Sequence, residues 1–237
     1  MDDPIKEKLR DIKCQTILDV ATGQGNLIGY LKELFPDSDE IVGIDNSPKA
    51  IKAAREKFSG NGYRFEQMDA SKMSFDNNYF DAVALSNSLH HFAEPKAILN
   101  EMYRVLKPGG LLMVFEMFRD NQNTSQKTHV LLHHWWAAVD SATGIVHNET
   151  YSRNEILDML ANLGLREFAV FDYADPNDDA REEKRIKWMK DIYKDYFARI
   201  EGKPEYTKLV GRGKELMKRL DKYGITWATM IGYVGKK

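Results

Sequence analysis

Hydrophobic and polar positions follow one repeating scheme through the first half of the chain. Short apolar runs predict buried strands over residues 15–20, 40–44, 63–68, 80–85 and 111–116. Between them, apolar residues at helical spacing predict helices over 26–35, 47–58 and 94–106. Strands and helices that alternate at this pitch predict a parallel sheet covered by helices on both faces.

The second half of the chain departs from this scheme. A stretch rich in His and Trp, residues 119–151, predicts a lid insertion, and a run dense in charge, 175–222, predicts an inserted helical pair. Residues 152–163 predict a capped helix, and 167–173 and 226–234 predict two more strands. No linker separates the halves, so we expect a single α/β domain over residues 1–237. Its sheet should be seven-stranded, mostly parallel and doubly wound, with an antiparallel last strand and helical insertions after strands five and six.

Composition narrows the class of protein. The 237 residues are 43% hydrophobic and 30% charged, which is typical of a globular protein, and the net charge of −2 argues against a nucleic-acid-binding surface. The single cysteine, Cys14, fits a reducing compartment. We find neither an apolar signal core at the N-terminus nor an apolar run of the ~18 residues that a membrane helix needs. We therefore expect a cytoplasmic protein without a membrane partner.

Candidate chemistry begins in residues 17–27, ILDVATGQGNL. Asp19 comes at the end of the first predicted strand, where an acid packs poorly against an apolar core. Gly23 and Gly25 follow closely, although two neighbouring glycines weaken any regular element. Both features make sense if the backbone of this turn approaches a ligand and the acid holds part of it.

Asp19, Asp45 and Asp69 follow the first three predicted strands, so we expect them at one edge of the sheet, where ligands of this fold class bind. Asp45 lies twenty residues beyond Gly25, the offset at which an acid accepts the hydroxyls of a ribose. A pyrophosphate would need a further glycine in the turn and would be repelled by Asp19. A cationic nucleoside with an amino-acid tail suits all three acids, and S-adenosylmethionine is such a molecule.

Each acid also has a purely structural interpretation. Asp19 would cap a turn, Asp45 would cap the helix that starts at Ser47, and Asp69 would be an ordinary turn residue. Three acids at three successive strand ends favour the ligand.

Five segments of the chain resemble, in order, the motifs of class I S-adenosylmethionine-dependent methyltransferases. The segments are DVATGQG, GIDNSPKAI, EQMDASKMSF, FDAVALSNSLHHF and VLKPGGLLMVFE. Within that family the chain is most similar to the small-molecule group that includes the quinone-ring methyltransferases, and the resemblance covers residues 15–117. Ala21 stands where the family usually has glycine, and we expect its small side chain to cost little.

The resemblance implies a role for each matched position. The implied cofactor-binding residues are Asp19, Ala21, Gly23, Gly25, Asp45, Asn46, Asp69, Ala70 and Ser86. Asp19 would hold the methionine ammonium and Asp45 the ribose hydroxyls. Asn46 would flank the adenine, whose edge would meet residues 69–70. The glycine turn would line the methionine and the ribose, and the backbone of Ser86 would face the amino-acid end.

The predicted function is methyl transfer from S-adenosylmethionine, by direct displacement, onto a small-molecule acceptor whose identity and accepting atom stay open. The protein must mainly align the acceptor and exclude water, and a base is needed only if the acceptor arrives protonated. His90 and His91, just after the fourth predicted strand, are the candidate catalytic residues. Their alternative interpretation is as polar residues of a short helix.

Residues 119–151 suggest the acceptor's surroundings. His133, Trp135, Trp136 and Tyr151 are candidates for an aromatic wall against a flat or cationic acceptor. The alternative is that they anchor the inserted segment to the body of the protein. His129 and His133 have the spacing of a zinc-binding helix, but the glutamate expected between them is absent, and we expect no metal.

Other functions remain open at this point. One is a non-catalytic module that binds S-adenosylmethionine, and another is a nicotinamide-dependent dehydrogenase. The oligomeric state is also open. The insertion at 175–222 would close over the pocket, pair with a second subunit or form a solvated outer layer.

Overall fold

The computed structural model describes residues 4–237, without the side chains of residues 167 and 168. One sheet contains all seven strands, in the order β3-β2-β1-β4-β5-β7-β6. The strands are β1 Thr16–Val20, β2 Glu40–Asp45, β3 Tyr63–Gln67, β4 Phe80–Ser86, β5 Leu106–Met117, β6 Arg166–Tyr173 and β7 Met230–Lys236. β7 runs antiparallel to both of its neighbours, and the other pairs are parallel. The predicted fold class is confirmed.

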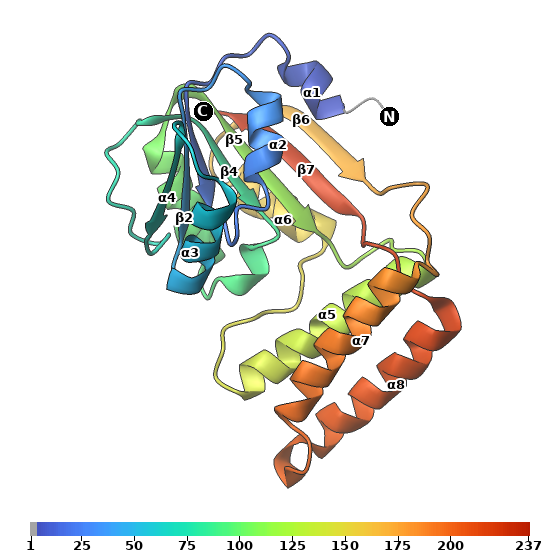
Figure 1. The fold of residues 1–237 in the computed structure, drawn as a ribbon. Helices are drawn as coiled ribbons and strands as arrows, with labels where there is room; N and C mark the ends of the chain where they lie inside the picture. The colour runs from blue at the N-terminus through green and yellow to red at the C-terminus, as the bar shows by residue number, and fades with distance from the viewer. Residues whose placement is uncertain (1–3) are drawn as a thin grey trace.

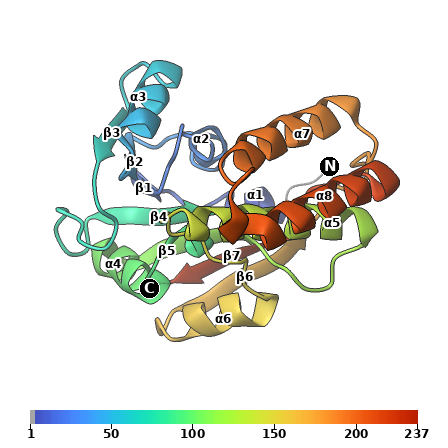
Figure 2. The ribbon, with the colours of Figure 1, turned by 90° about the horizontal axis from the view of Figure 1, so that it is seen from below.

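Helices cover both faces of this sheet because successive strand residues point to opposite sides. In β1, Ile17 packs with the first group of helices and Leu18 with the second. The first group is α1 Pro4–Leu9, α2 Ile28–Leu34 and α3 Pro48–Lys57, and the second is α4 Pro95–Val105 and α6 Arg153–Ala161. Figure 2 shows the two groups on opposite sides of the strands.

The strand order places a binding crevice between β1 and β4. β1 pairs with β2 on one side and with β4 on the other, so the chain leaves the sheet in opposite directions from this point. In open parallel sheets, ligands bind beyond the carboxyl ends of the strands at such a reversal. The ends of β1, β2 and β4 therefore converge on the expected site.

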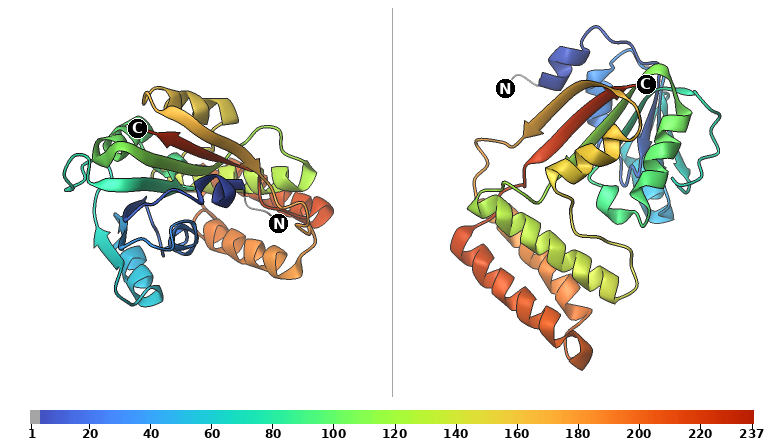
Figure 3. Two further views of the ribbon diagram at one scale, coloured as in Figure 1. Left: turned by 90° about the horizontal axis from the view of Figure 1, so that it is seen from above. Right: turned by 180° about the vertical axis from the view of Figure 1, so that it is seen from behind.

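Three helices form a separate layer beyond that edge of the sheet (Figures 1 and 3). These are α5 Thr124–Ala142, α7 Glu183–Ala198 and α8 Thr207–Tyr223, and we call them the helical cap. The cap has its own apolar core, which includes Leu132, Trp135, Met189, Leu216 and Leu220. The predicted helical pair is confirmed as α7 and α8. Within residues 4–237, no helix has both the length and the apolar character required to cross a membrane.

Local chemistry explains where the helices around the site begin. Asn123 and Gln126 form a reciprocal capping box at the start of α5, and Ser152 and Glu155 form another at the start of α6. Between α5 and α6, residues 143–152 run as a loop back to the sheet. Two 3₁₀ turns, Leu89–His91 (η1) and Pro204–Tyr206 (η2), complete the elements.

Two predicted boundaries are wrong. The last strand starts at Met230, not at 226. The residues before it are held by helix α5 of the cap instead: the hydroxyls of Thr226 and Ser125 lie 2.8 Å apart, and the amide of Ala228 donates to His129. The fifth strand starts at Leu106, not at 111. Residues 107–110 form part of this strand, with an irregular register against β4.

Candidate functional site

A cavity of about 550 Å³ opens at the carboxyl ends of β1, β2 and β4. Eight of the nine residues predicted to bind a cofactor line it: Asp19, Ala21, Gly23, Asp45, Asn46, Asp69, Ala70 and Ser86. Gly25 is the exception, since a Cβ atom built on it would lie 2.6 Å from the ring of Phe58. Gly25 therefore permits packing beneath the turn, whereas the other eight positions face the cavity.

The glycine turn approaches the cavity with its backbone in the left-handed region. The φ angles of Ala21, Gly23 and Gly25 are 54°, 55° and 76°. A Cβ atom at Gly23 would meet no atom within 4 Å, so open space for a ligand lies against this residue. The sequence predicted that alanine in place of glycine at position 21 costs little stability because its side chain is small. Side-chain size is not the deciding factor, because a left-handed alanine carries backbone strain that glycine avoids.

Asp19 is the most perturbed acid of the cavity. Only 1% of its surface is exposed, and the Thr22 hydroxyl donates a 2.6 Å hydrogen bond to its Oδ2. Burial raises the pKa of Asp19 to about 7, the hydrogen bond from Thr22 opposes that rise, and the charge of Asp45 adds to it. A positive group placed in the cavity beside Asp19 would offset the cost of burying the carboxylate.

Asp45 lines the cavity, and two backbone amides hold its carboxylate. Its Oδ1 accepts from the amide of Ser47, the N-cap of α3, and its Oδ2 accepts from the amide of Gly23. These two bonds fix the carboxylate at the cavity wall. A carboxylate has about four lone-pair sites, so capacity remains for the hydroxyls of a ligand.

Asp69 likewise lines the cavity and closes a turn. The amide and the hydroxyl of Ser71 both donate to Asp69 Oδ1 at 2.8 Å, and these bonds lower the pKa of Asp69. The ligand interpretation and the structural one are therefore compatible for both acids.

A second cavity, of about 660 Å³, adjoins the first and is lined mainly by apolar and aromatic side chains. Tyr30, Phe115 and Phe171 contribute aromatic rings, and Leu27 and Ser86 line both cavities. The rings of Tyr30 and Phe115 meet edge to face, with centroids 5.8 Å apart. The sequence did not single out these residues, because an aromatic residue within a predicted strand looks like core.

The predicted aromatic wall lies elsewhere. Of the described residues that line the two cavities, none is His133, Trp135, Trp136 or Tyr151. Trp135 is fully buried in the cap, where it stacks on Tyr193 and donates to the carbonyl of Leu209. The aromatic content of this segment therefore builds the core of the cap, and Trp135 ties α5 to α7 and α8 rather than to the body of the protein.

The part of residues 119–151 that does reach the first cavity is the loop after α5. Ile145 and Val146 line the cavity and are about half exposed, at 53% and 52%. A pair of exposed aliphatic residues at a cavity mouth is suited to contact with an apolar ligand. Position in the loop, and not aromatic content, is what brings this segment to the site.

The two candidate catalytic histidines are in different environments. His90 is 1% exposed, and its Nδ1 lies 2.6 Å from Glu116 Oε1. His91 lines the first cavity, and desolvation of its ring, followed by the charges of His90 and His147, lowers its pKa to about 3. His91 is therefore neutral near pH 7 and is a weak proton acceptor. Its catalytic role, and that of His90, stay predictions.

Glu116 is a site residue that the sequence motif contained without a role. It is fully buried at the end of β5, and its Oε2 accepts from the amides of Ser88 and Leu89. With the contact to His90, this single carboxylate fixes the whole turn η1 beside the cavity. An acid within an apolar strand, VFE, is the signal that could have indicated it.

Comparisons with known proteins agree with this geometry. Residues 18–114 match the family model of a methyltransferase domain. Demethylmenaquinone methyltransferase of Thermus thermophilus is 43% identical over 102 residues, which are 42% of this chain and 46% of that protein. The ubiquinone/menaquinone biosynthesis C-methyltransferase of Desulfotalea psychrophila is 35% identical over 94 residues, or 40% of this chain and 38% of that one.

A solved structure from Bacillus halodurans, which carries a provisional methyltransferase name, is similar over nearly the whole fold. Its TM-score is 0.64 at 19% identity, and the match covers 99% of this chain and 98% of that one. The chain spans less than half the length of the two curated relatives, 46% and 38%. Together these matches confirm the fold and the resemblance of this chain to methyltransferases.

Proposed function

We propose that this protein is a methyltransferase that moves the methyl group of S-adenosylmethionine, by direct displacement, onto a small-molecule acceptor. The observation that carries the proposal is the buried Asp19 carboxylate in a nucleoside-sized cavity, beside the oriented carboxylate of Asp45. A phosphate-bearing dinucleotide would meet repulsion from Asp19, whereas a cationic nucleoside would be attracted.

The residues present fit this cofactor. Asp19 would hold the ammonium, Asp45 the ribose hydroxyls, and Asn46, Asp69 and Ala70 the adenine, with the open space at Gly23 admitting the backbone side of the ligand. When bound, S-adenosylmethionine supplies a methyl group whose leaving group is already in place. The chain's own task is to align the acceptor and to keep water out.

The second cavity supports an acceptor with a flat apolar part. It shares Leu27 and Ser86 with the first cavity, so an acceptor seated between Tyr30, Phe115 and Phe171 lies next to the expected position of the methyl group. The two relatives reported above carry names from quinone biosynthesis. These points favour a quinone-type ring as the acceptor. His91, at the wall of the first cavity, would accept a proton only from an acceptor that arrives protonated.

Net charge and the single cysteine support the proposed acceptor class and a cytoplasmic location. The net charge of −2 favours a small-molecule acceptor over nucleic acid. Cys14 is buried, and burial raises the pKa of its thiol to about 12, so it is an inert packing residue and compatible with a reducing cytoplasm.

Two measurements test the proposal. Calorimetry should show tighter binding of S-adenosylhomocysteine than of NAD; the reverse order would favour a dehydrogenase. Labelled S-adenosylmethionine should then transfer its methyl group to at least one member of a panel of reduced quinones, and Asp45→Ala should reduce that transfer at low cofactor concentration. If the cofactor binds and no acceptor in a broad panel of phenols, quinols, amines and thiols becomes labelled, the protein is a binding module.

A further inference from the structure

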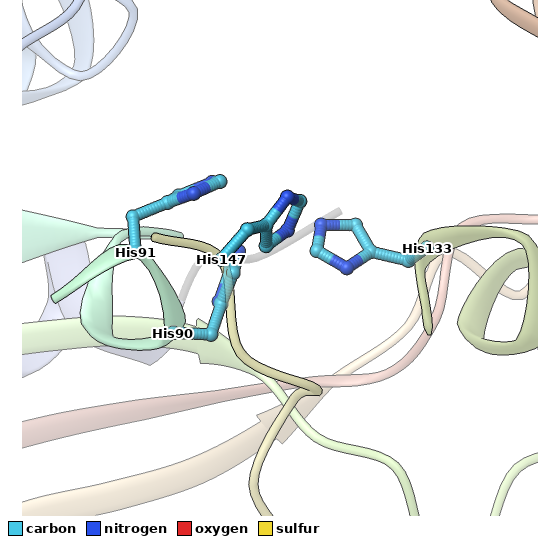
Figure 4. A group of neighbouring side chains, drawn as sticks. All are labelled: His90, His91, His133 and His147. Carbon is cyan, nitrogen blue, oxygen red and sulfur yellow. The ribbon is translucent and has the colours of Figure 1, made fainter. Parts of the chain in front are cut away.

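Four of the six histidines of the chain converge on one point beside the first cavity (Figure 4). They are His90 and His91 in η1, His133 in α5 and His147 in the loop between α5 and α6. One ring nitrogen from each can be chosen so that all four lie within 4.8 Å of one another. The rings come from three separate segments and point towards a common centre.

Three of the four histidines have a buried ring nitrogen without a hydrogen bond. Among the described side chains of residues 4–237, five buried nitrogens have no partner, and three belong to this group: Nε2 of His90, Nδ1 of His133 and Nε2 of His147. An unpaired buried polar atom is costly, so native proteins contain few of them. Three such atoms around one point indicate a shared ligand that accepts lone pairs from nitrogen.

The opposite ring nitrogens are held by carboxylates. Glu116 Oε1 lies 2.6 Å from Nδ1 of His90, and Asp140 Oδ2 lies 2.7 Å from Nδ1 of His147. A carboxylate in this position keeps the proton on Nδ1 and leaves the lone pair of Nε2 directed away, as in histidines that bind metals. Asp140 is itself fixed by the Tyr196 hydroxyl at 2.9 Å and by Arg199 at 2.6 Å.

The carboxylate contacts also suit the form of the ring that a metal needs. Neutral imidazole is the form that coordinates a metal ion. Packing alone would place the rings together, but it would not leave three lone pairs unpaired at the same point.

We propose that His90, His91, His133 and His147 form a binding site for one divalent transition-metal ion of the zinc class. Four imidazole ligands suit Zn²⁺ and its neighbours in the first row, whereas Mg²⁺ and Ca²⁺ require oxygen ligands. Zn–N bonds of about 2.0–2.1 Å in a tetrahedral site place the nitrogens roughly 3.4 Å apart. The nitrogens lie within 4.8 Å of one another at present, so they would draw together when an ion binds.

The location gives the ion a consequence beyond its own binding. It would join the cap, through His133, to the end of β4, through His90 and His91, and would fix the loop that carries Ile145 and Val146 directly before His147. His91 belongs both to this cluster and to the wall of the first cavity. The ion would therefore hold the mouth of that cavity in shape. This site replaces the sequence-based expectation of no metal.

Metal binding is testable without any methyl-transfer assay. Protein freed of metal with a chelator should bind one Zn²⁺ per chain in calorimetry, and Zn²⁺ should raise its melting temperature. Co²⁺ should produce the visible absorption of a low-coordinate nitrogen site, which Zn²⁺ then bleaches. Asp140→Asn, which leaves all four ligands in place, should weaken Zn²⁺ binding by about 10–100-fold.

Variants separate this site from adventitious binding. His133→Ala and His147→Asn should each abolish the Co²⁺ absorption; asparagine at 147 retains a donor towards Asp140. His129→Ala is the matched control, because His129 lies one turn before His133 in α5 but pairs with the amide of Ala228. Circular dichroism and a melting curve establish that each variant is folded.

Several results would overturn the proposal. They are the absence of a stoichiometric Zn²⁺ site in the folded wild type, equal competition by Mg²⁺, or an unchanged Co²⁺ spectrum in folded His133→Ala and His147→Asn. An equal loss in His129→Ala would also overturn it. A failure of these tests leaves the proposed methyl transfer untouched, because the latter is measured by cofactor binding and product formation.

Discussion

Asp19→Asn should weaken cofactor binding and make the ligand-free protein more stable near neutral pH. The size of both effects follows from the burial of this side chain. The change keeps the shape of the residue and an acceptor for the Thr22 hydroxyl, but it removes the charge. With 1% of its surface exposed, Asp19 has a pKa of about 7 in the ligand-free protein. In an unfolded chain the pKa of aspartate is about 3.9.

A carboxyl group with a raised folded-state pKa contributes stability that is complete below the unfolded value and is lost as the pH rises through the folded value. The window for Asp19 therefore runs from about pH 4 to about pH 7. At 1.36 kcal/mol for each unit, the ligand-free wild type loses about 4 kcal/mol across the whole window. Between pH 5 and pH 8 it should lose about 3 kcal/mol more than Asp19→Asn in denaturant unfolding.

Cofactor binding should show the opposite trend. A ligand ammonium binds the charged carboxylate, so below pH 7 binding must first remove a proton from Asp19. The affinity of the wild type for S-adenosylhomocysteine should fall about 15-fold from pH 7 to pH 5.5, with a slope that approaches about tenfold per pH unit well below the pKa of Asp19. Asp19→Asn should bind weakly at every pH and show no such slope. His91 does not interfere, because its pKa of about 3 lies outside this range.

The assay is isothermal titration calorimetry from pH 5.5 to pH 7, where the ligand's own α-amino group stays protonated. Asp69→Asn is the matched control: Asp69 lines the same cavity, but its pKa is already lowered by Ser71, so the wild-type slope should persist. A flat profile for the wild type would refute the reasoning, and so would an undiminished slope in Asp19→Asn.

Three further substitutions test separate parts of the structure. Asp45→Ala removes charge-assisted hydrogen bonds of ~1.5–3 kcal/mol each and should weaken S-adenosylhomocysteine binding tenfold or more in calorimetry; an unchanged dissociation constant would place the ribose elsewhere. Ala21→Gly relieves left-handed strain of about 1–2 kcal/mol in the folded protein, and the greater entropy of the unfolded chain offsets about 0.4–1 kcal/mol of this. Denaturant unfolding should therefore show a free energy of unfolding higher by roughly 0.5–1 kcal/mol, and a lower value would show that the methyl group of Ala21 packs favourably. Trp135→Ala should cost about 3–5 kcal/mol of stability with little change in cofactor affinity, and the reverse pattern would return Trp135 to the site.

The first cavity could be predicted because short-range rules position the residues that line it. Asp19 and Asp45 sit at the ends of apolar strands, and parallel strands bring such ends to one edge. The Gly23 backbone needs a conformation that its residue type supplies. Ser47 and Pro48 mark the start of α3 in the sequence as they do in the structure. Each of these features depends on residues close together in the chain.

The acceptor side could not be predicted in this way, because it depends on which distant segments meet. Phe115 and Phe171 face the second cavity only because β5 and β6 flank the antiparallel β7. Trp135 is in the core of the cap because α7 and α8, some fifty to ninety residues later, pack around it. An aromatic residue that is buried in a cap and one that lines a pocket have the same sequence pattern, so the sequence does not distinguish them.

Asp140 shows how the cap acts on the site from a distance. Its carboxylate accepts from Arg199 and Tyr196 at the end of α7 and also contacts the ring of His147. These contacts hold its pKa below the usual range, although burial acts in the opposite direction. Asp140 therefore stays charged and can link the C-terminal ends of α5 and α7 to the loop that lines the cavity. A shift of α7 would move His147, and with it Ile145 and Val146, so the shape of the cavity mouth depends on helices that do not themselves line it.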